Sequence, residues 1–327
     1  MVGKVTSPTQ LSSSRVVPFV LEEMGMLYQF STRNDELQKT IDAIKGFDTS
    51  IDETEPMRFG NLLEPIILHE CFRKLRCDNF STQIADPYQH NSLPLACSLD
   101  GYILGQGQVI ETNIDEGIYV MNDQQKIILT GNSFIPVEAK STAHFFSDNP
   151  PLDRGIVQLQ SSMLITGGEI GILTVLHQGY KHCVYIFEKN PQMQELIEDC
   201  VRDFERRIDI FKKTKKIEWY ELATSSDGNT AYPEAKEETI DLDDDVDDMC
   251  SIILELKNRK KDIDSKIDMM EKKIKEKMKE SSKAQTDNHW INWSMRNYKA
   301  TPERVVPAKD ARTVRSTTLT IKEKDNG

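Results

Sequence analysis

Two acidic residues and a lysine occupy positions from which they could support hydrolysis of a phosphodiester. Glu138 and Lys140 stand two residues apart in a run of mostly apolar residues, and Asp100 precedes Gly101 after a short apolar run. Side chains two apart in a strand project to the same face, so Glu138 and Lys140 are expected side by side. Two carboxylates supply the oxygen ligands that Mg²⁺ prefers, together with water and phosphate oxygens. The lysine can hold or deprotonate an attacking water, or offset charge on the phosphorane, as metal-assisted hydrolysis requires.

Each of these features is ordinary when it is taken alone. A Glu and a Lys on one strand are commonly a surface ion pair, and an Asp-Gly dipeptide is commonly a turn. The combination is more specific, because Asp100 ends one strand while Glu138 and Lys140 lie on a neighbouring one. We therefore expect a metal site rather than a surface pair.

Two helices are expected to add polar side chains to this set. Glu64 lies on the same helical stripe as four apolar residues, Ile67, Leu68, Cys71 and Leu75. A carboxylate on a core-facing stripe is costly unless it is paired or bound to a metal, so the alternative for Glu64 is a buried salt bridge. Gln160 shares the apolar stripe of a second helix, where the alternative is a core hydrogen bond. Gln158 falls on the opposite, serine-lined side of that helix.

The elements that must position these residues alternate between helix and strand. Helical spacing predicts a helix over 61–75, with its start set by Pro65, which is tolerated only near a helix start. Short strands separated by Gly, Asn and Asp turns are expected at 95–97, 108–110, 118–121, 126–130 and 134–140. A helix over 154–165, a hairpin of strands 170–176 and 182–187, and a long helix with Asn190 as its N-cap follow. This order predicts an α/β domain over residues 1–216, with a central mixed sheet flanked by helices.

The remainder of the chain has a different composition. Residues 217–249 are expected to form an acidic linker. Residues 250–327 are expected to hold a C-terminal helical hairpin or short coiled coil and a basic tail, because apolar residues recur at heptad spacing from Ile253 to Ile274. Lysines occupy two positions of that seam, Lys260 and Lys277, which argues against a long autonomous coiled coil.

Charge and composition exclude some classes of protein and leave others open. The net charge of −12 comes from 41 Lys and Arg against 53 Asp and Glu, but residues 234–248 alone hold nine acids and one lysine. A net charge that is concentrated in one run does not exclude nucleic-acid binding. No apolar run approaches the roughly 20 residues of a membrane span, and the N-terminus lacks the apolar segment of a secretory signal. The six cysteines form no CxxC motif, which favours free thiols in a reducing compartment.

Four motifs in a fixed order resemble a known family. They are Arg58-Phe-Gly-Asn-Leu-Leu-Glu64-Pro-Ile, Ser98-Leu-Asp100-Gly101, Val137-Glu138-Ala139-Lys140-Ser and Val157-Gln158-Leu-Gln160-Ser-Ser-Met-Leu-Ile-Thr-Gly167. In this order they resemble the YqaJ-type viral recombinases, relatives of phage lambda exonuclease with the PD-(D/E)XK restriction-endonuclease-like fold. The resemblance covers about residues 10–215.

The resemblance implies a Mg²⁺- or Mn²⁺-dependent 5′→3′ exonuclease that acts on the ends of double-stranded DNA, with two ions per site. It also implies a homotrimeric ring, a single-strand annealing protein as partner in phage-type recombination, and the cytoplasm of a bacterial host as location, encoded by a phage or prophage. No membrane partner is expected.

The resemblance also assigns roles to single residues. Asp100 and Glu138 become metal ligands with the Ala139 carbonyl, and Lys140 becomes the water-positioning base or stabiliser. Glu64 becomes a second-metal or water-mediated ligand, while Gln160 orients groups in the catalytic site, with Gln158 nearby. Ser14 matches a serine that holds the 5′ phosphate.

Two departures from the family pattern affect the expected site. The family's arginine shortly before that serine is missing, so Arg15 or Lys4 is expected to bind the 5′ phosphate instead. The gap between Asp100 and Glu138 is stretched to 38 residues by an inserted hairpin at about 103–136.

Other readings remain from the same residues. A site-specific or structure-specific DNA endonuclease of the same fold would use the same carboxylates, and a non-catalytic DNA-end-binding protein would keep them without turnover. An iron–sulfur nuclease would need four cysteine ligands, some closely spaced near the end, whereas Cys250 alone lies beyond Cys200.

Overall fold

The chain divides into two compact units, Met1–Ala231 and Tyr232–Gly327, in a computed structural model that describes residues 6–295 except 83, 85, 151 and 235. The helices of these residues are α1 (Val17–Glu23), α2 (Arg33–Ile44), α3 (Glu55–Leu75), α4 (Ile156–Thr166), α5 (Pro191–Thr214), α6 (Asp227–Ala231) and α7 (Asp244–Met278), with a short 3-10 helix at Leu152–Arg154. The strands are β1 (Leu11–Ser12), β2 (Phe80–Ser81), β3 (Tyr88–Gln89), β4 (Leu95–Cys97), β5 (Gly101–Leu104), β6 (Gln108–Glu111), β7 (Ile118–Val120), β8 (Lys126–Leu129), β9 (Phe134–Thr142), β10 (Ile170–His177), β11 (Lys181–Glu188), β12 (Lys283–Gln285) and β13 (Trp290–Asn292).

A six-stranded mixed sheet forms the centre of the first unit, with strand order β2-β5-β9-β10-β11-β7. Strand β9 runs parallel to β10 and antiparallel to β5, and β10 and β11 likewise each have one parallel and one antiparallel neighbour. The expected α/β class with a central mixed sheet is therefore confirmed.

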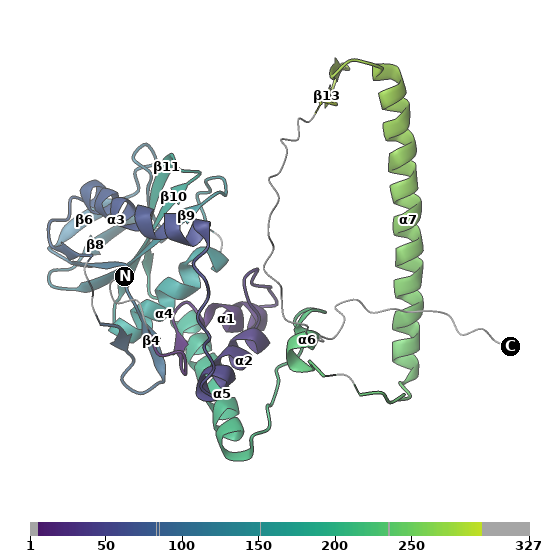
Figure 1. Ribbon diagram of the computed structural model, residues 1–327. Helices are drawn as coiled ribbons and strands as arrows, with labels where there is room; N and C mark the ends of the chain where they lie inside the picture. The colour runs from purple at the N-terminus through teal and green to yellow at the C-terminus, as the bar shows by residue number, and fades with distance from the viewer. Residues whose placement is uncertain (1–5, 83, 85, 151, 235, 296–327) are drawn as a thin grey trace, which may run out of the picture. The chain divides into compact units, whose positions relative to one another are not determined.

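Helices cover both faces of this sheet, α3 on one face and α4 on the other (Figure 1). Along β9 the side chains of Ile135, Val137 and Ala139 pack in the core with α3. Because side chains alternate along a strand, Glu138 and Lys140 project toward the face that α4 covers. The alternation of β9 thus separates an apolar face from the face that carries the charged residues.

Helix α3 begins six residues earlier than the sequence predicts. It starts at Glu55, with Pro56 in its first turn, and Pro65 lies inside the helix. The expectation that Pro65 marks the helix start was wrong. The apolar residues from Ile67 to Leu75 that follow Pro65 are buried against the sheet, and this packing offsets the hydrogen bond that a proline removes from the helix interior.

The inserted segment 103–136 is more than a hairpin. Strands β6 and β8 do pair as a two-stranded ribbon, but β7 between them leaves the ribbon and pairs parallel to β11 as the edge strand of the central sheet. All three residues of β7 are buried, so burying Ile118, Tyr119 and Val120 against the main sheet accounts for this placement.

The long helix α5 begins as the sequence predicts. The Asn190 side chain accepts a hydrogen bond from the Met193 N–H at 3.0 Å, and Pro191 is the first residue of the helix. The apolar stripe of α5, including Phe204 and Ile208, packs in one core with α1 and α2.

The first unit extends to Ala231, fifteen residues past the expected boundary at 216. Buried polar groups hold the added segment. Asn34 on α2 donates to the Tyr220 carbonyl at 3.2 Å and accepts from the Tyr220 N–H at 2.8 Å. Asp227, which is also buried, accepts from Asn34 at 2.9 Å and from Thr32 at 2.6 Å. Residues 217–231 are therefore part of the folded unit rather than of an acidic linker.

The second unit contains one long helix where a helical hairpin or short coiled coil is expected. Helix α7 spans 35 residues and begins inside the acidic run, with Asp243 as its N-cap. Among the described residues it is followed by the antiparallel pair β12 and β13, not by a returning helix. The second helix of the expected hairpin is thus absent up to residue 295, and most of the basic tail lies outside the described residues.

All six cysteines are free thiols, five of them buried, as the sequence predicts. Among the described residues, no helix combines the length and apolar character needed to cross a lipid bilayer.

The hydrogen bonds of Asn34 with Tyr220 and Asp227 lead to a prediction about stability. Replacing this fully buried residue in Asn34→Ala leaves the Tyr220 backbone groups without partners. We expect a loss of about 3 kcal/mol in the free energy of unfolding, measured by urea denaturation followed by fluorescence of the nearby Trp219. Ser226→Ala, at an exposed position of the same segment, is the control and should change stability by less than about 0.5 kcal/mol. Equal stability of the two variants would show that the hydrogen bonds of Asn34 do not hold residues 217–231 in the first unit.

Candidate active site

Asp100 and Glu138 face each other across two paired strands. Strands β5 and β9 are antiparallel, with Gly101 opposite Val137. The same register continued by one residue sets Asp100 opposite Glu138, and residues that face each other in an antiparallel pair share one side of the sheet. Asp100 accepts a hydrogen bond from the Ala139 N–H at 2.9 Å, which fixes it against β9. Both carboxylates are buried, with 8% of Asp100 and 2% of Glu138 exposed.

Lys140 links this pair to helix α4. Its ammonium group lies 2.5 Å from a carboxylate oxygen of Glu138 and 3.1 Å from the side-chain oxygen of Gln158. Glu138 and Lys140 thus lie side by side, as the sequence predicts. Gln158, in the first turn of α4, is the glutamine that contacts it.

The close approach of α4 to β9 depends on Gly155. This residue precedes α4 with a φ of 115°, and a Cβ atom there would lie 2.7 Å from the Leu173 side chain and 3.6 Å from Lys140. A larger residue would therefore have to displace Leu173 or move the helix start, in addition to the strain of the positive φ. Gly155 lets Gln158 reach Lys140.

The electrostatics of the cluster keep Lys140 charged. Burial by itself would lower the pKa of Lys140, but the carboxylates of Glu138 and Asp100 outweigh it and raise the pKa above its ordinary value. A lysine that is an ammonium at neutral pH donates hydrogen bonds and offsets negative charge. Of the two roles expected for Lys140, this charge state favours the stabiliser over the base.

Lys140 connects the cluster to a cavity of about 630 Å³, whose wall does not include Asp100 or Glu138. Lys140 and Gln158 form part of its wall, and the rest of the wall includes Tyr28, Phe30, His144, Phe145 and His177. Burial lowers the pKa of His177, which keeps its imidazole neutral near pH 7. A substrate group in this cavity would meet the Lys140 ammonium, the side-chain amides of Gln158 and Asn149, the Asp153 carboxylate and several aromatic rings.

The residues present fit a divalent cation. Asp100, Glu138 and Lys140 together carry two negative charges and one positive charge, and two buried carboxylates side by side are stabilised by a bound cation. Among the described residues there is no group of three or more His, Cys, Asp or Glu side chains that could hold a metal. The chain would thus provide two carboxylates, and water or phosphate oxygens would complete the coordination, as Mg²⁺ commonly has it. The Ala139 carbonyl as a further ligand stays a prediction.

Gln160 does not join this cluster, and a role for Glu64 stays a prediction. Glu64 lies on α3, one turn before Leu68, whose side chain packs against Gly101. The Gln160 amide donates to the Glu188 carbonyl at 2.9 Å and accepts from the Asn190 N–H at 2.9 Å. Gln160 therefore holds the junction of β11 and α5, which is the core hydrogen bond considered as its alternative role.

Arg15 is not available to bind a 5′ phosphate. Its guanidinium group donates to Glu36 at 2.5 Å and 3.1 Å, to Thr40 at 2.7 Å, and to the carbonyls of Pro8 and Gln10 at 3.1 Å and 3.0 Å. These five bonds use all five N–H donors of an arginine. The expectation for Arg15 was wrong, because the residue anchors the N-terminal segment to α2. Lys4 lies outside the described residues.

Ser14 remains compatible with its expected role. It is exposed, and its hydroxyl lies 3.1 Å from that of Ser12, in the turn that leads into α1. Helix α1 begins with Val17, which lines the cavity. A role for Ser14 in binding a 5′ phosphate stays a prediction.

The cavity wall contains residues that sequence reasoning missed. Tyr28 and Phe30 come from the loop between α1 and α2, His144 and Phe145 from the loop after β9, and His177 from the end of β10. None belongs to a motif with regular spacing, so only the fold brings them together. The position of His144 shortly after Lys140 was the one available signal.

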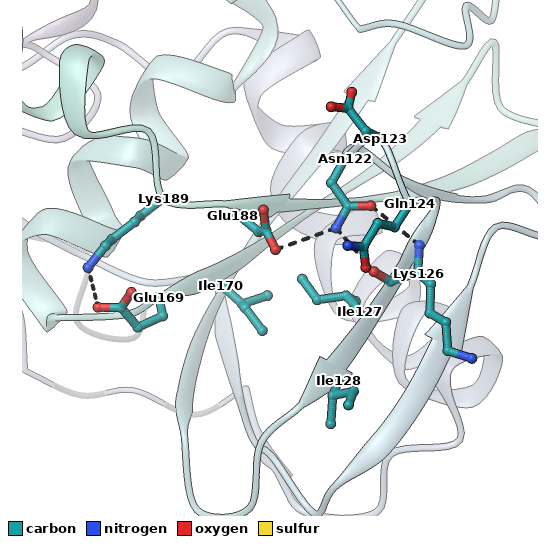
Figure 2. Close-up of a pocket in the computed structure, with 10 residues that line it drawn as sticks. All are labelled: Asn122, Asp123, Gln124, Lys126, Ile127, Ile128, Glu169, Ile170, Glu188 and Lys189. Carbon is teal, nitrogen blue, oxygen red and sulfur yellow. Dashed lines mark hydrogen bonds and ion pairs between the residues drawn. The ribbon is translucent and has the colours of Figure 1, made fainter.

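A second hollow, of about 770 Å³, contains none of these residues (Figure 2). Its polar contacts are exposed ones: Lys189 lies 2.5 Å from Glu169, and Asn122 donates to Glu188 at 3.4 Å. The described residues of this hollow include no buried pair of carboxylates beside a lysine, so we place the candidate site at Lys140.

No protein-family model matches the chain, and no curated protein matches it. Among solved structures it is similar to an alkaline exonuclease, LHK-Exo, from Laribacter hongkongensis, at 12% identity and a TM-score of 0.43. The structure of LHK-Exo in complex with dAMP gives 12% identity and a TM-score of 0.42. In both comparisons the match covers 64% of this chain and 94% of the other chain.

The contacts of Arg15 predict a structural role that can be measured. In Arg15→Lys a single ammonium cannot replace five directed donors, so we expect the free energy of unfolding to fall by about 2 kcal/mol. Urea denaturation measures this change. Arg73→Lys, which alters an exposed ion pair with Glu70, is the matched control and should cost less than about 0.5 kcal/mol. An Arg15→Lys variant as stable as the parent protein would show that the network around Arg15 is not formed.

Proposed function

We propose that this chain hydrolyses phosphodiester bonds of DNA with the help of a divalent cation. The observation that carries the proposal is the meeting of Asp100, Glu138 and Lys140 on two adjacent strands, with Lys140 bound to Gln158 and lining a cavity. Hydrolysis of a phosphodiester needs oxygen ligands for a metal and a cation beside the attacked phosphorus, and this cluster supplies both.

Each residue of the cluster has a part in this chemistry. A Mg²⁺ or Mn²⁺ ion held by Asp100 and Glu138 would supply Lewis acidity toward a phosphate oxygen. Lys140 positions the attacking water with its ammonium protons and offsets the negative charge that grows on the phosphorane. Gln158 orients Lys140 through the 3.1 Å hydrogen bond between their side chains. A second ion, with Glu64 among its ligands, stays a prediction from the family resemblance.

We further propose that the substrate is the end of linear double-stranded DNA and that digestion runs 5′→3′. The support is the order of the four sequence motifs, which resembles that of the YqaJ-type recombinases over about residues 10–215. The homotrimeric ring, the single-strand annealing partner and the role in phage-type recombination stay predictions from the same resemblance.

The charge of the first unit bears on how DNA would bind. Residues 1–231 carry 21 Lys and Arg against 32 Asp and Glu, a net charge of −11. The acidic run at 234–248 lies outside this unit, and the basic residues of the second unit balance it. Nearly all of the net charge of the chain therefore belongs to the folded first unit rather than to the run. Phosphate contacts depend on positive charge, so divalent cations at the site should strengthen DNA binding by this unit.

Three substitutions test the cluster. Asp100→Asn and Glu138→Gln remove charge with little change in shape. We expect each to lower the rate of duplex hydrolysis by at least about a hundredfold and to weaken Mn²⁺ binding in calorimetric titrations. Lys140→Ala should lower the rate by a similar factor without weakening Mn²⁺ binding, because it removes the ammonium that competes for Glu138.

The control for these variants is Glu169→Gln, which removes an exposed carboxylate that is paired with Lys189 in the second hollow. It should keep the parental rate and the parental affinity for Mn²⁺. If either carboxylate variant of the cluster cleaves DNA at the parental rate, the assignment of the site is wrong.

The form of the substrate separates an exonuclease from an endonuclease. With Mg²⁺ present we expect linear duplex to be degraded and closed circular duplex to stay intact, and nucleotides to leave from 5′-labelled ends first. Comparison of 5′- and 3′-labelled linear DNA with covalently closed circles measures both properties. Cleavage of the circles would favour an endonuclease of the same fold, and binding without cleavage would favour a DNA-end-binding protein.

A further inference from the structure

Helix α7 carries a continuous apolar seam at heptad spacing. The seam begins at Val246 and repeats at alternate intervals of three and four residues to Lys277. Its a positions are Val246, Ile253, Lys260, Ile267 and Ile274, and its d positions are Met249, Leu256, Ile263, Met270 and Lys277. Eight of these ten residues are apolar. A strict seven-residue repeat of this kind is the pattern by which two helices supercoil around each other.

The seam is exposed in the single chain. The six apolar seam residues Met249, Leu256, Ile263, Ile267, Met270 and Ile274 are 41–59% exposed. In the part of the chain that the structure describes, Met278 is the one buried residue of α7. A row of apolar side chains about 42 Å long, interrupted at Lys260 and exposed on a surface, marks a site of association.

The charges beside the seam are complementary to those of a second copy of the same helix. The g positions Arg259 and Lys266 are basic, and the e positions that follow them, Asp264 and Glu271, are acidic. In a parallel, in-register pair, Arg259 of one helix lies beside Asp264 of the partner helix, and Lys266 lies beside Glu271. The other g–e pairs of this arrangement join no like charges: Asp245 with Cys250, Ile252 with Lys257, and Lys273 with Met278.

An antiparallel pair of the same helix would be disfavoured. In that arrangement the g positions of the two helices face each other. With the two seams fully overlapped, Arg259 of each helix would lie beside Lys266 of the other and Lys257 beside Asp264. The antiparallel pair would therefore contain two repulsive contacts and two attractive ones, whereas the parallel pair contains four attractive contacts and no repulsive one. The helix is therefore complementary to a parallel copy of itself.

We propose that α7 binds the α7 helix of a second copy of this chain as a parallel, in-register, two-stranded coiled coil. β-Branched residues fill four of the five a positions, while Ile263 is the one β-branched residue among the five d positions, a distribution that favours two strands. Lys260 at an a position weakens the coil, as the sequence led us to expect, but it also restricts register and strand number, because its stem lies along the interface while its ammonium reaches solvent.

This association joins two first units at the same end of one coil. Helix α7 follows the first unit in the chain after residues 232–243, so a parallel pair attaches both first units at its N-terminal end. The pairing is a property of the second unit and requires no contact between the first units.

The charges can be exchanged to test the proposal in the full chain. The double variants R259E/K266E and D264K/E271K each place like charges at all four g–e pairs of a homodimer. We expect self-association of each to weaken by about a hundredfold, measured by sedimentation at several concentrations. A mixture of the two variants restores every attraction and should associate as tightly as the parent chain. Two variants that associate like the parent, or a mixture that stays as weak as its components, would overturn the proposal.

Crosslinking tests the direction and the register. Cys250 is the one partly exposed cysteine, so Cys250→Ser provides a background in which a new thiol can be placed. Oxidation of M249C/C250S, with its thiol at a d position, should yield a covalent dimer. The matched control N258C/C250S, with its thiol on the outer face of the helix, should stay monomeric. A monomeric M249C/C250S chain, or crosslinks between M249C/C250S and I274C/C250S chains in a mixture, would show that no parallel pair forms.

Discussion

The register between β5 and β9 is the constraint on which the candidate site depends. With Gly101 opposite Val137, Asp100 faces Glu138, and Lys140 follows on the same side of the sheet. A slip of one residue would turn Glu138 and Lys140 toward α3 and bring Val137 and Ala139 to the cavity. The apolar core between α3 and the sheet prevents that slip, because Ile135, Val137 and Ala139 are buried in it. Packing on the α3 face of the sheet thus determines that Asp100, Glu138 and Lys140 lie together on the other face.

The same arrangement holds charges that a folded core would otherwise avoid. Glu138 is almost fully buried and Asp100 nearly so, and Lys140 neutralises only part of their charge. A hydrogen bond from the Ala139 backbone and the short contact between Lys140 and Glu138 offset some of the cost. A site that concentrates negative charge in this way is stable with a divalent cation, and Gly155 brings α4 close enough for Gln158 to hold the lysine. Asp100, Glu138 and Lys140 are therefore costly to bury without a cation, and the same three side chains are the ones proposed to act in hydrolysis.

Local patterns predicted the elements of this fold well and its long-range contacts less well. The alternation along β9, the helix of Gln158 and the cap at Asn190 follow from spacing and residue type, and the structure has them. Long-range packing decided the rest: β7 joins the central sheet because its residues are buried there, and Pro65 lies inside α3 because the apolar turns after it pack on the sheet. Gln160 was assigned to the site by its position in a motif, and Arg15 as a substitute for an arginine that this chain lacks. Backbone groups of Glu188 and Asn190 bind Gln160 instead, and Arg15 is bound by Glu36, Thr40 and two nearby carbonyls. Tyr28 and His144 reach the cavity from separate loops and His177 from the end of β10, and no local sequence pattern predicts that they come together.

The central claim is that Asp100 and Glu138 together hold a divalent cation beside Lys140. Anomalous diffraction from crystals soaked in Mn²⁺ tests it most directly, because it locates the ion without reference to activity. We expect an anomalous peak about 2.0–2.3 Å from a carboxylate oxygen of each residue. Crystals whose Mn²⁺ lies elsewhere, with Glu138 still paired to Lys140 and no peak between the two carboxylates, would contradict it.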